Sequence, residues 1–348
     1  MTRKQKLAIL VSTFSLITYF GYIKLGLHES VSSELVGDEN SSTIAHEQTK
    51  RNGKASNIEG AFTNQDGEMI VQAHQKTGTS NSTFGVWQEL AGSIKISRVD
   101  TVNEKQLILM LRVEADTSVY DEIRELLQLG PNSASDRTQE YLLSLLAAIN
   151  TPESVAVLLD ALKTLSSPSS NTVYVVKKSI QKISRDATHI SLLKDSFVEL
   201  EEDNLYIGDV ARGIARNASE LDFEFLIGIA QTDDNKSKVA LSSLQYLNNE
   251  RLVPSLQYVI DSNAADSQLI AASLSSLANM GQYEAAVALI KWSANQDASN
   301  LAYVRHLISQ AESRSPSMSR AIEKTLDNQV FVNPEVKEMI ELIYSDSK

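Results

Sequence analysis

Apolar positions from about residue 142 onward recur at a regular interval. Six anchor residues can be placed in one register, separated by 34, 34, 30, 33 and 30 residues. These anchors are Leu146, Ile180, Ile214, Leu244, Leu277 and Leu307. The positions four before and three after each anchor are also mostly apolar, and these offsets lie on one face of an α-helix. The pattern predicts six amphipathic helices, each with a stripe that must be buried.

A second set of apolar positions indicates that each repeat holds two helices. Leucine stands twelve residues after five of the six anchors, at Leu158, Leu192, Leu226, Leu256 and Leu289. Only the sixth repeat departs, with Ser319 at this position. Short polar joints lie between the two sets, at 150–152, 184–186, 218–220, 248–250 and 281–282. In the first joint Thr151 precedes Pro152, which is the residue order of a helix N-terminus.

A period of 30–34 residues with two short helices is typical of an α-solenoid, in which each helical hairpin buries its apolar stripe against its neighbours. Two segments, 116–130 and 141–165, resemble the helices of HEAT-type repeats. This resemblance extends over about residues 103–345 and implies an all-α fold of about six to seven stacked hairpins. One unit, 277–288, is similar to the middle of a tetratricopeptide repeat. The other units lack its Gly-x-Tyr-x-x-Ala pattern, so peptide binding is not carried over to the array.

The N-terminus carries the pattern of a membrane anchor. Three basic residues precede an uncharged run from Leu7 to Ile23. We expect one transmembrane signal anchor at 7–27, because a helix of this length, at about 1.5 Å per residue, reaches across the hydrocarbon of a bilayer. The positive-inside rule keeps residues 1–6 in the cytoplasm and places the body outside it. The chain is therefore expected to be a single-pass protein of the inner membrane, with a periplasmic body in a Gram-negative cell.

Two other interpretations of this run remain open, a cleaved signal peptide and a buried soluble helix. Cleavage requires small residues shortly after the apolar stretch. The stretch instead ends in Phe20, Gly21, Tyr22 and Ile23, and this ending favours an uncleaved anchor.

The next residues are polar and show no sustained periodicity. Residues 28–83 are rich in Ser, Asn, Gly and Gln, a composition that predicts a flexible polar tether. Residues 84–102 follow as a junction of ambiguous structure. The helical-repeat domain is expected over 103–345.

The segment 90–115 fits two structures. Its alternating apolar residues are compatible with a β-hairpin. Alternatively, Asn103 to Ala115 forms a helix, and Asp116 or Thr117 caps the next one. We favour the helix because the repeats that follow continue its pattern.

The composition narrows the range of functions. The chain has no cysteine, which excludes disulfides, thiol nucleophiles and cysteine-bound metals. It has 44 acidic and 32 basic residues, and residues 1–24 hold four of the bases and no acid, so residues 25–348 carry 28 − 44 = −16 charges. An acidic body is unfavourable for binding nucleic acid. No nucleic-acid partner is expected.

Residues suited to catalysis do not gather in the sequence. Three of the five histidines lie in the predicted tether, and His189 and His306 belong to different repeats. We interpret them as solvated or helix-terminal side chains. The carboxylates between 199 and 203 crowd one predicted loop, which is more typical of a solvated connector than of a calcium site. No catalytic residue, cofactor or metal is predicted, and we do not expect an enzyme.

Four bases form the one candidate binding surface, which we call the basic ridge. It consists of Lys178, Lys182, Arg212 and Arg216. They stand two residues before and after the anchors Ile180 and Ile214, on the helix face opposite the apolar stripe. Such a ridge is suited to an anionic partner, such as an acidic protein segment, a lipid headgroup or a cell-wall polymer. The competing interpretation is a solvated face neutralised by Asp209, Glu199 or Glu201.

Together these patterns predict a membrane-tethered scaffold that mediates protein–protein interaction in the cell envelope. Its protein partner is unknown, and the basic ridge would suit an acidic one. Two alternatives stay open. One is an envelope hydrolase, or a carrier of lipids or other apolar ligands, with a site formed between repeats. The other is a folding factor for a secreted client protein.

Overall fold

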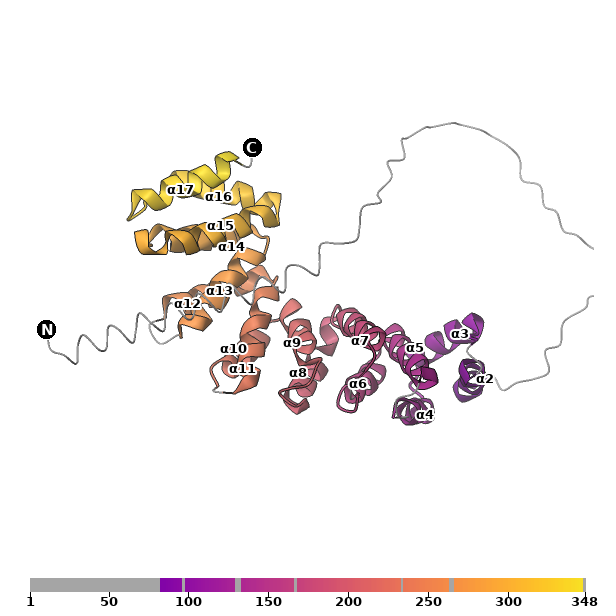
Figure 1. Ribbon diagram of the computed structural model, residues 1–348. Helices are drawn as coiled ribbons and strands as arrows, with labels where there is room; N and C mark the ends of the chain where they lie inside the picture. Colours follow the sequence, from indigo (N-terminus) through magenta and orange to yellow (C-terminus); the bar gives the residue numbers. More distant parts are fainter. Residues whose placement is uncertain are drawn as a thin grey trace, which may run out of the picture. The chain divides into compact units, whose positions relative to one another are not determined.

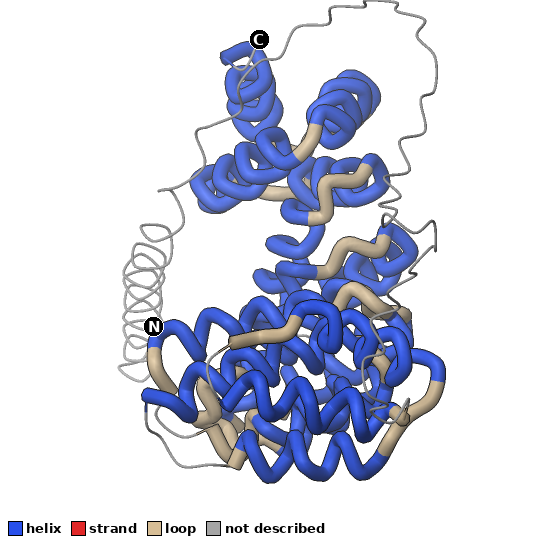
Figure 2. The backbone as a smooth tube through the Cα atoms, turned by 90° about the vertical axis from the view of Figure 1, so that its right-hand side faces the viewer, coloured by secondary structure: helices blue, strands red, loops and turns tan. Residues whose placement is uncertain are grey.

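The computed structural model describes residues 82–95, 98–128, 133–165, 168–232, 234–262 and 266–346. These residues belong to the second of the two units into which the chain divides, 75–348. Within the described residues every regular element is a helix, as Figure 2 shows. None of these helices is both long enough and apolar enough to cross a membrane. The predicted anchor at 7–27 and the tether up to residue 81 lie outside the described residues.

The helices follow one another in chain order (Figure 1). The first eight are α2 (Thr83–Lys95), α3 (Thr101–Val113), α4 (Thr117–Leu127), α5 (Ser133–Ile149), α6 (Pro152–Ala161), α7 (Ser170–Ile183), α8 (Ile190–Glu199) and α9 (Ile207–Arg216). The next eight are α10 (Glu220–Ala230), α11 (Asn235–Ser243), α12 (Val253–Asp261), α13 (Ser267–Asn279), α14 (Tyr283–Ala294), α15 (Leu301–Arg314), α16 (Pro316–Asn328) and α17 (Pro334–Asp346). Short 3₁₀ turns stand at η1 (Ala187–His189), η2 (Leu244–Tyr246), η3 (Glu250–Leu252) and η4 (Ala298–Asn300).

The helices pack in two series that run along the chain. Each odd-numbered helix from α3 to α17 contacts the next odd-numbered one. The even-numbered helices do the same from α2 to α8 and again from α12 to α16. Between these stretches, α10 packs mainly against α9, α11 and η3, and its backbone approaches α8 and α12 less closely. This makes α10 the exception in its series.

The positions predicted from the apolar register are buried. All six anchors, from Leu146 to Leu307, are at most 1% exposed. Of the leucines twelve residues later, Leu192 is partly buried and the other four are fully buried. The sixth repeat uses a neighbouring residue instead of Ser319, since Met318 in α16 is 0% exposed. The buried faces of both helices in these repeats are therefore confirmed.

The described part of the ambiguous segment 90–115 contains the end of α2 and the whole of α3, and no strand. Asp100 caps α3 by accepting hydrogen bonds from the amides of Val102 and Asn103, and Asp116 caps α4 in the same way. The β-hairpin interpretation is thus wrong and the favoured helix is confirmed. The junction 84–102 contains a further helix, α2, whose side chains Trp87 and Leu90 are fully buried. The packed region therefore includes α2 and is not limited to the expected residues from 103 onward.

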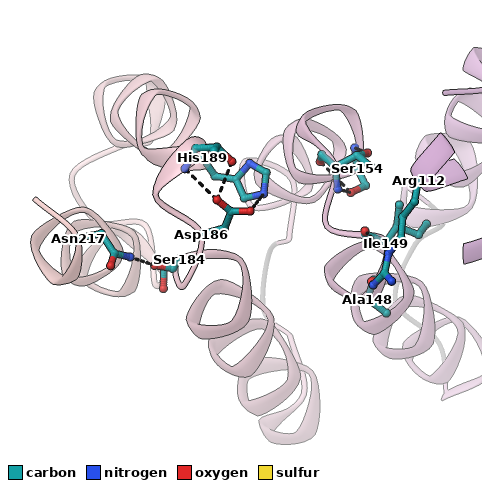
Figure 3. A network of polar contacts seen from close by, with 10 residues as sticks. Arg112, Ala148, Ile149, Ser154, Ser184, Asp186, His189 and Asn217 are labelled. Atoms are coloured by element: carbon teal, nitrogen blue, oxygen red, sulfur yellow. Dashed lines mark hydrogen bonds and ion pairs between the residues drawn. The ribbon is translucent and has the colours of Figure 1, made fainter. Parts of the chain in front are cut away.

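The polar joints connect consecutive repeats through side chains. The last carbonyls of a helix have no partner within the helix itself. Here the amide of Asn217 donates to the carbonyl of Ser184, and the guanidinium of Arg112 donates to those of Ile149 at 3.0 Å and Ala148 at 2.6 Å (Figure 3). Further along the chain, equivalent bonds run from Asn249 to Ala218 at 3.1 Å, from Gln282 to Asn248 at 2.5 Å and from Ser315 to Gly281 at 2.7 Å. These bonds tie each helix end to the adjacent repeat.

Two of the joints turn through left-handed backbone. Asn150 has a φ of 57° and Gly281 a φ of 72°. Asparagine and glycine are the residues that adopt this conformation at least cost. After Asn150, Thr151 and Ser154 form a reciprocal capping box at the start of α6, which confirms the predicted N-cap.

Candidate partner-binding surfaces

The structure brings the basic ridge together on two adjacent helices. Lys178 and Lys182 are exposed on α7, and Arg212 and Arg216 are half-buried on α9, which packs against α7. The Lys178 ammonium lies 5.5 Å from the centre of the Tyr174 ring. Among the described residues, no acidic side chain lies within ion-pair distance of Lys178, Lys182 or Arg216.

Arg212 differs from the other three bases because it is engaged within the fold. Its guanidinium lies 3.5 Å from the Asp209 carboxylate and 4.5 Å from the centre of the Tyr246 ring in η2. Of the three acids considered as neutralising partners, only Asp209 pairs with the ridge. Glu199 instead pairs with Lys163 at 2.6 Å. Arg212 thus contacts η2 from α9, whereas the other three bases form no ion pair with a described residue.

The acidic segment after α8 is a loop, as predicted. Glu201, Glu202 and Asp203 are exposed. A shallow hollow of about 320 Å³ lies beside them and includes Lys163, whose pKa is raised by hydrogen bonds to Asp160 and Glu199. In the described part of the chain no group of His, Asp and Glu is arranged to hold a metal ion. Glu199 is thus ion-paired at the end of α8, and the loop that follows exposes its carboxylates to solvent.

The two histidines outside the predicted tether are not close to each other. His189 stands at the start of α8 and is 1% exposed, so it is helix-terminal but not solvated. Its Nε2 lies 3.9 Å from the Asp186 carboxylate, and neither ring nitrogen has a hydrogen-bond partner (Figure 3). Hydrogen bonds from the hydroxyl and amide of Thr188 lower the pKa of the Asp186 carboxyl. His306 is exposed on α15, which does not pack against α8.

A groove that the sequence did not predict lies between α10 and α12. It has a volume of about 550 Å³ and is open to solvent. Phe223 and Ile227 of α10 contribute apolar side chains, together with Val259 of α12 and Leu269 of α13. Glu220 and Glu224 line it along α10, and Tyr258, which is 78% exposed, lines it along α12. We call this feature the α10–α12 groove.

The helix that forms one wall of the groove is unusually apolar for a surface helix. The sequence of α10 is ELDFEFLIGIA, with apolar residues on every side. A helix of this kind is normally buried. Here only three of its eleven residues are buried, whereas α14, an apolar helix of the same series, buries seven of its twelve. The remaining apolar side chains of α10 are partly buried, except for Leu221, which is 73% exposed.

Small residues explain why the groove stays open. Gly228 of α10 faces it, and a Cβ atom added there would meet nothing within 4 Å. The facing wall carries Ser255 of α12. Glycine has no side chain and that of serine is short. Neither residue therefore fills the space between α10 and α12, whose backbones make few close approaches.

The opposite side of α10, toward α8, is filled. The rings of Phe197 and Phe225 meet edge to face at 6.3 Å, and the Lys194 ammonium lies 3.1 Å from the Asp222 carboxylate. Lys236 donates to the carbonyls of Phe197 at 3.2 Å and Val198 at 2.7 Å, at the end of α8. Long side chains thus fill the space between α10 and α8, whereas the space between α10 and α12 stays open.

The ion pair between Lys194 and Asp222 contributes to a lowered pKa of the Asp222 carboxyl. Burial raises it, but hydrogen bonds from the Ser219 hydroxyl, the Ser219 amide and Lys194 lower it by more in total. The pKa of the carboxyl therefore lies below its ordinary value of 3.8. Asp222 also closes the capping box of α10 with Ser219, so one side chain serves both the helix start and the contact with α8.

Comparisons of the chain with family models, with curated proteins and with solved structures found no match. Support for the candidate surfaces therefore comes from the residues and geometry of this chain and not from a related protein. One signal in the sequence could have pointed to the groove. The segment 220–230 is apolar on all helical faces, although its place in the repeat predicts an amphipathic helix with an exposed side.

Proposed function

We propose that this protein is a membrane-tethered helical-repeat scaffold that binds another protein in the cell envelope and does so without catalysis. The described helices serve as a HEAT-like α-solenoid, the segment 7–27 is the membrane anchor, and the body lies outside the cytoplasm. Helices that pack mainly against near neighbours in the chain support the solenoid. The observation that carries the proposal is the α10–α12 groove.

The groove has the features of a protein-binding surface. Protein interfaces combine an apolar centre with a polar rim and are enriched in tyrosine. The groove has Phe223 and Ile227 inside it and Glu224 and the exposed Tyr258 along it. A volume of about 550 Å³ accommodates several side chains of a partner.

Site-specific photocrosslinking in the native membrane tests this proposal. A photoreactive phenylalanine replaces Tyr258 in the groove or, as the control, Leu342 of α17, which is 63% exposed. We expect position 258 to give a discrete crosslinked protein that position 342 does not give. A second control adds Gly228→Trp, which fills the groove and should remove the product. Identical crosslinks from both positions would count against the groove as the binding site.

The membrane tether has its own test. The full chain is expected to remain in the membrane pellet after alkaline carbonate extraction, and a protease added to spheroplasts should degrade its body. Deletion of residues 2–27 should release the body from the pellet. A body that is protected from external protease would contradict the proposed orientation.

The basic ridge is a second surface in this proposal, and the structure changes how it should be probed. Arg212 is held by Asp209 and Tyr246, so replacing it would disturb the fold. Reversing the charges of Lys178, Lys182 and Arg216 is the cleaner variant. We expect it to lower the yield of a negatively charged partner in a crosslinking pull-down, and an unchanged yield would assign the ridge to solvent.

A carrier of apolar ligands is the second candidate function. It is favoured by the apolar side chains of the groove, which lies between two repeats, where such a site was expected. In this case the purified full chain should yield bound lipid on extraction with organic solvent, and Gly228→Trp should lower the amount. Lipid recovery that is the same for both proteins would argue against this function.

A further inference from the structure

The exposed side of α10 determines the size and shape of a partner element that could bind there. Residues 220, 223, 224, 227, 228 and 231 all line the groove and recur at the spacing of one helical face. The groove thus extends along the whole of α10, an 11-residue helix. At about 1.5 Å per residue this is about 16 Å, or about three helical turns. A short helix lying beside α10 has matching dimensions, and helices commonly bind in apolar grooves of this kind.

The charges along the groove indicate which kind of helix would bind there. Among the described residues that line the groove, Glu220 and Glu224 are the only charged ones, and both are exposed. Within the described residues, no basic side chain lies within ion-pair distance of either carboxylate. An acidic partner would be repelled here, whereas lysine or arginine at the edge of an apolar face would pair with these carboxylates.

We propose that the α10–α12 groove binds an amphipathic, basic helix of a partner protein. The inference rests on the proposed scaffold function and specifies its partner. The apolar face of the bound helix covers Ile227 and Val259 and packs against Tyr258. Its basic residues pair with Glu220 and Glu224. Binding in this way covers the side of α10 that the fold leaves exposed.

Direct binding of a defined probe tests the inference. The full chain is placed in phosphatidylcholine nanodiscs, and empty nanodiscs supply the background. The probe is a fluorescent 15-residue peptide of Leu and Lys, with Leu at helical i, i+3, i+4 and i+7 spacing. Two peptides serve as controls: one has the same composition in scrambled order, and the other replaces Lys with Glu. We expect binding of the amphipathic Leu/Lys peptide alone.

Matched variants locate the binding. Gly228→Trp fills the groove without changing the charge and should weaken binding about tenfold. Gly228→Ala leaves the groove open and should bind like the native chain. Replacing Glu220 and Glu224 with Gln should weaken binding about three- to tenfold, the effect of losing two exposed ion pairs. Circular dichroism verifies that each variant is folded, and Tyr258→Ala provides a second groove variant because its exposed side chain does not support the fold.

Several outcomes would overturn the inference. Equal binding to the native chain and to both Gly228→Trp and Tyr258→Ala would show that the peptide binds elsewhere on the acidic surface. Equal binding of the scrambled or Leu/Glu peptide would remove the requirement for an amphipathic or a basic helix. If position 258 still crosslinks a protein in the membrane, the scaffold function stands and only the partner's chemistry is wrong. If position 258 crosslinks nothing, the scaffold function proposed for the groove fails as well.

Discussion

The two sides of α10 differ in whether side chains fill the space to the neighbouring helix. Toward α8, Phe225 meets Phe197, and Asp222 pairs with Lys194, so side chains fill the space between helices. Toward α12, Gly228 faces a hollow of about 550 Å³. The backbone spacing is wide on both sides. The difference therefore lies in side-chain length, and it shows that a groove in stacked helices can be specified by a few small residues.

The filled side of α10, toward α8, and the open side, toward α12, should respond differently to substitution. Every bridging group toward α8 belongs to the fold, so a change there should affect stability. The groove side carries Tyr258, which is 78% exposed, and the partly buried Ile227, and exposed apolar patches on folded proteins often mark binding sites. Changes there should affect binding while leaving the fold intact. The predictions that follow test this division.

The largest effect is expected from Phe197→Ala. The ring is 0% exposed and packs against Phe225, so its removal leaves a cavity and should lower the free energy of unfolding by about 3–5 kcal/mol. Tyr258→Ala on the groove side is the matched control and should change stability by less than about 0.5 kcal/mol. Urea unfolding followed by circular dichroism measures both. A large loss from Tyr258→Ala would mean that the groove side also supports the fold.

The next effect comes from the charge that bridges α8 and α10. Asp222→Asn keeps the shape of the side chain and removes its charge, so stability at pH 7 should fall by about 1–2 kcal/mol. Because the folded pKa of Asp222 is lowered, its contribution is present above the unfolded pKa of about 3.9 and is lost as the pH falls through the folded value.

The pH dependence provides the control for this prediction. The difference between the native chain and Asp222→Asn should shrink as the pH falls below about 4, measured by urea unfolding at each pH. A difference that stays constant down to pH 2 would show that shape and not charge sets the contribution of Asp222.

The sequence predicted the parts of this comparison that depend on repetition. Leu226, twelve residues after its anchor, is buried where the register placed it, and the joint at 218–220 starts α10. Repetition works because each repeat buries its stripe against similar neighbours. It also favoured a helix over a β-hairpin after residue 103, and α3, which Asp100 caps, confirms this.

The features that were missed depend on distance between elements. The groove needs small residues and also a wide spacing of α10 and α12, and the apolar segment 220–230 marks an unusual helix without giving that spacing. Likewise, Arg212 was assigned to the basic ridge, but Tyr246, more than thirty positions later, holds it in the fold. The helix α2 was missed because Ile94 appeared to begin an alternating strand pattern, although Trp87 and Leu90 share its helical face.

A smaller loss is expected at the joint before η3, which is bonded to the segment that precedes α10. The Asn249 amide donates to the carbonyl of Ala218 at 3.1 Å, and its side-chain oxygen accepts from the amide of Arg251 at 3.2 Å. Asn249→Ala removes both bonds and should lower the free energy of unfolding by about 1 kcal/mol. Hydrogen exchange should also increase at the start of α10. Asn295→Ala, whose amide donates only to Lys291 within its own helix end, should leave α10 unchanged.

The smallest effect should be a gain in stability. Gly228 lies inside α10, its φ is not positive, and a Cβ atom would meet nothing within 4 Å. Gly228→Ala should therefore raise the free energy of unfolding by about 0.5–1 kcal/mol, since alanine loses less backbone entropy in a helix. Gly213→Ala in α9 is the matched control, because its Cβ would lie 3.0 Å from the Cβ of Ser184. If urea unfolding shows a loss for Gly228→Ala as well, the groove side of α10 is packed and not open, and the contrast between its two sides disappears.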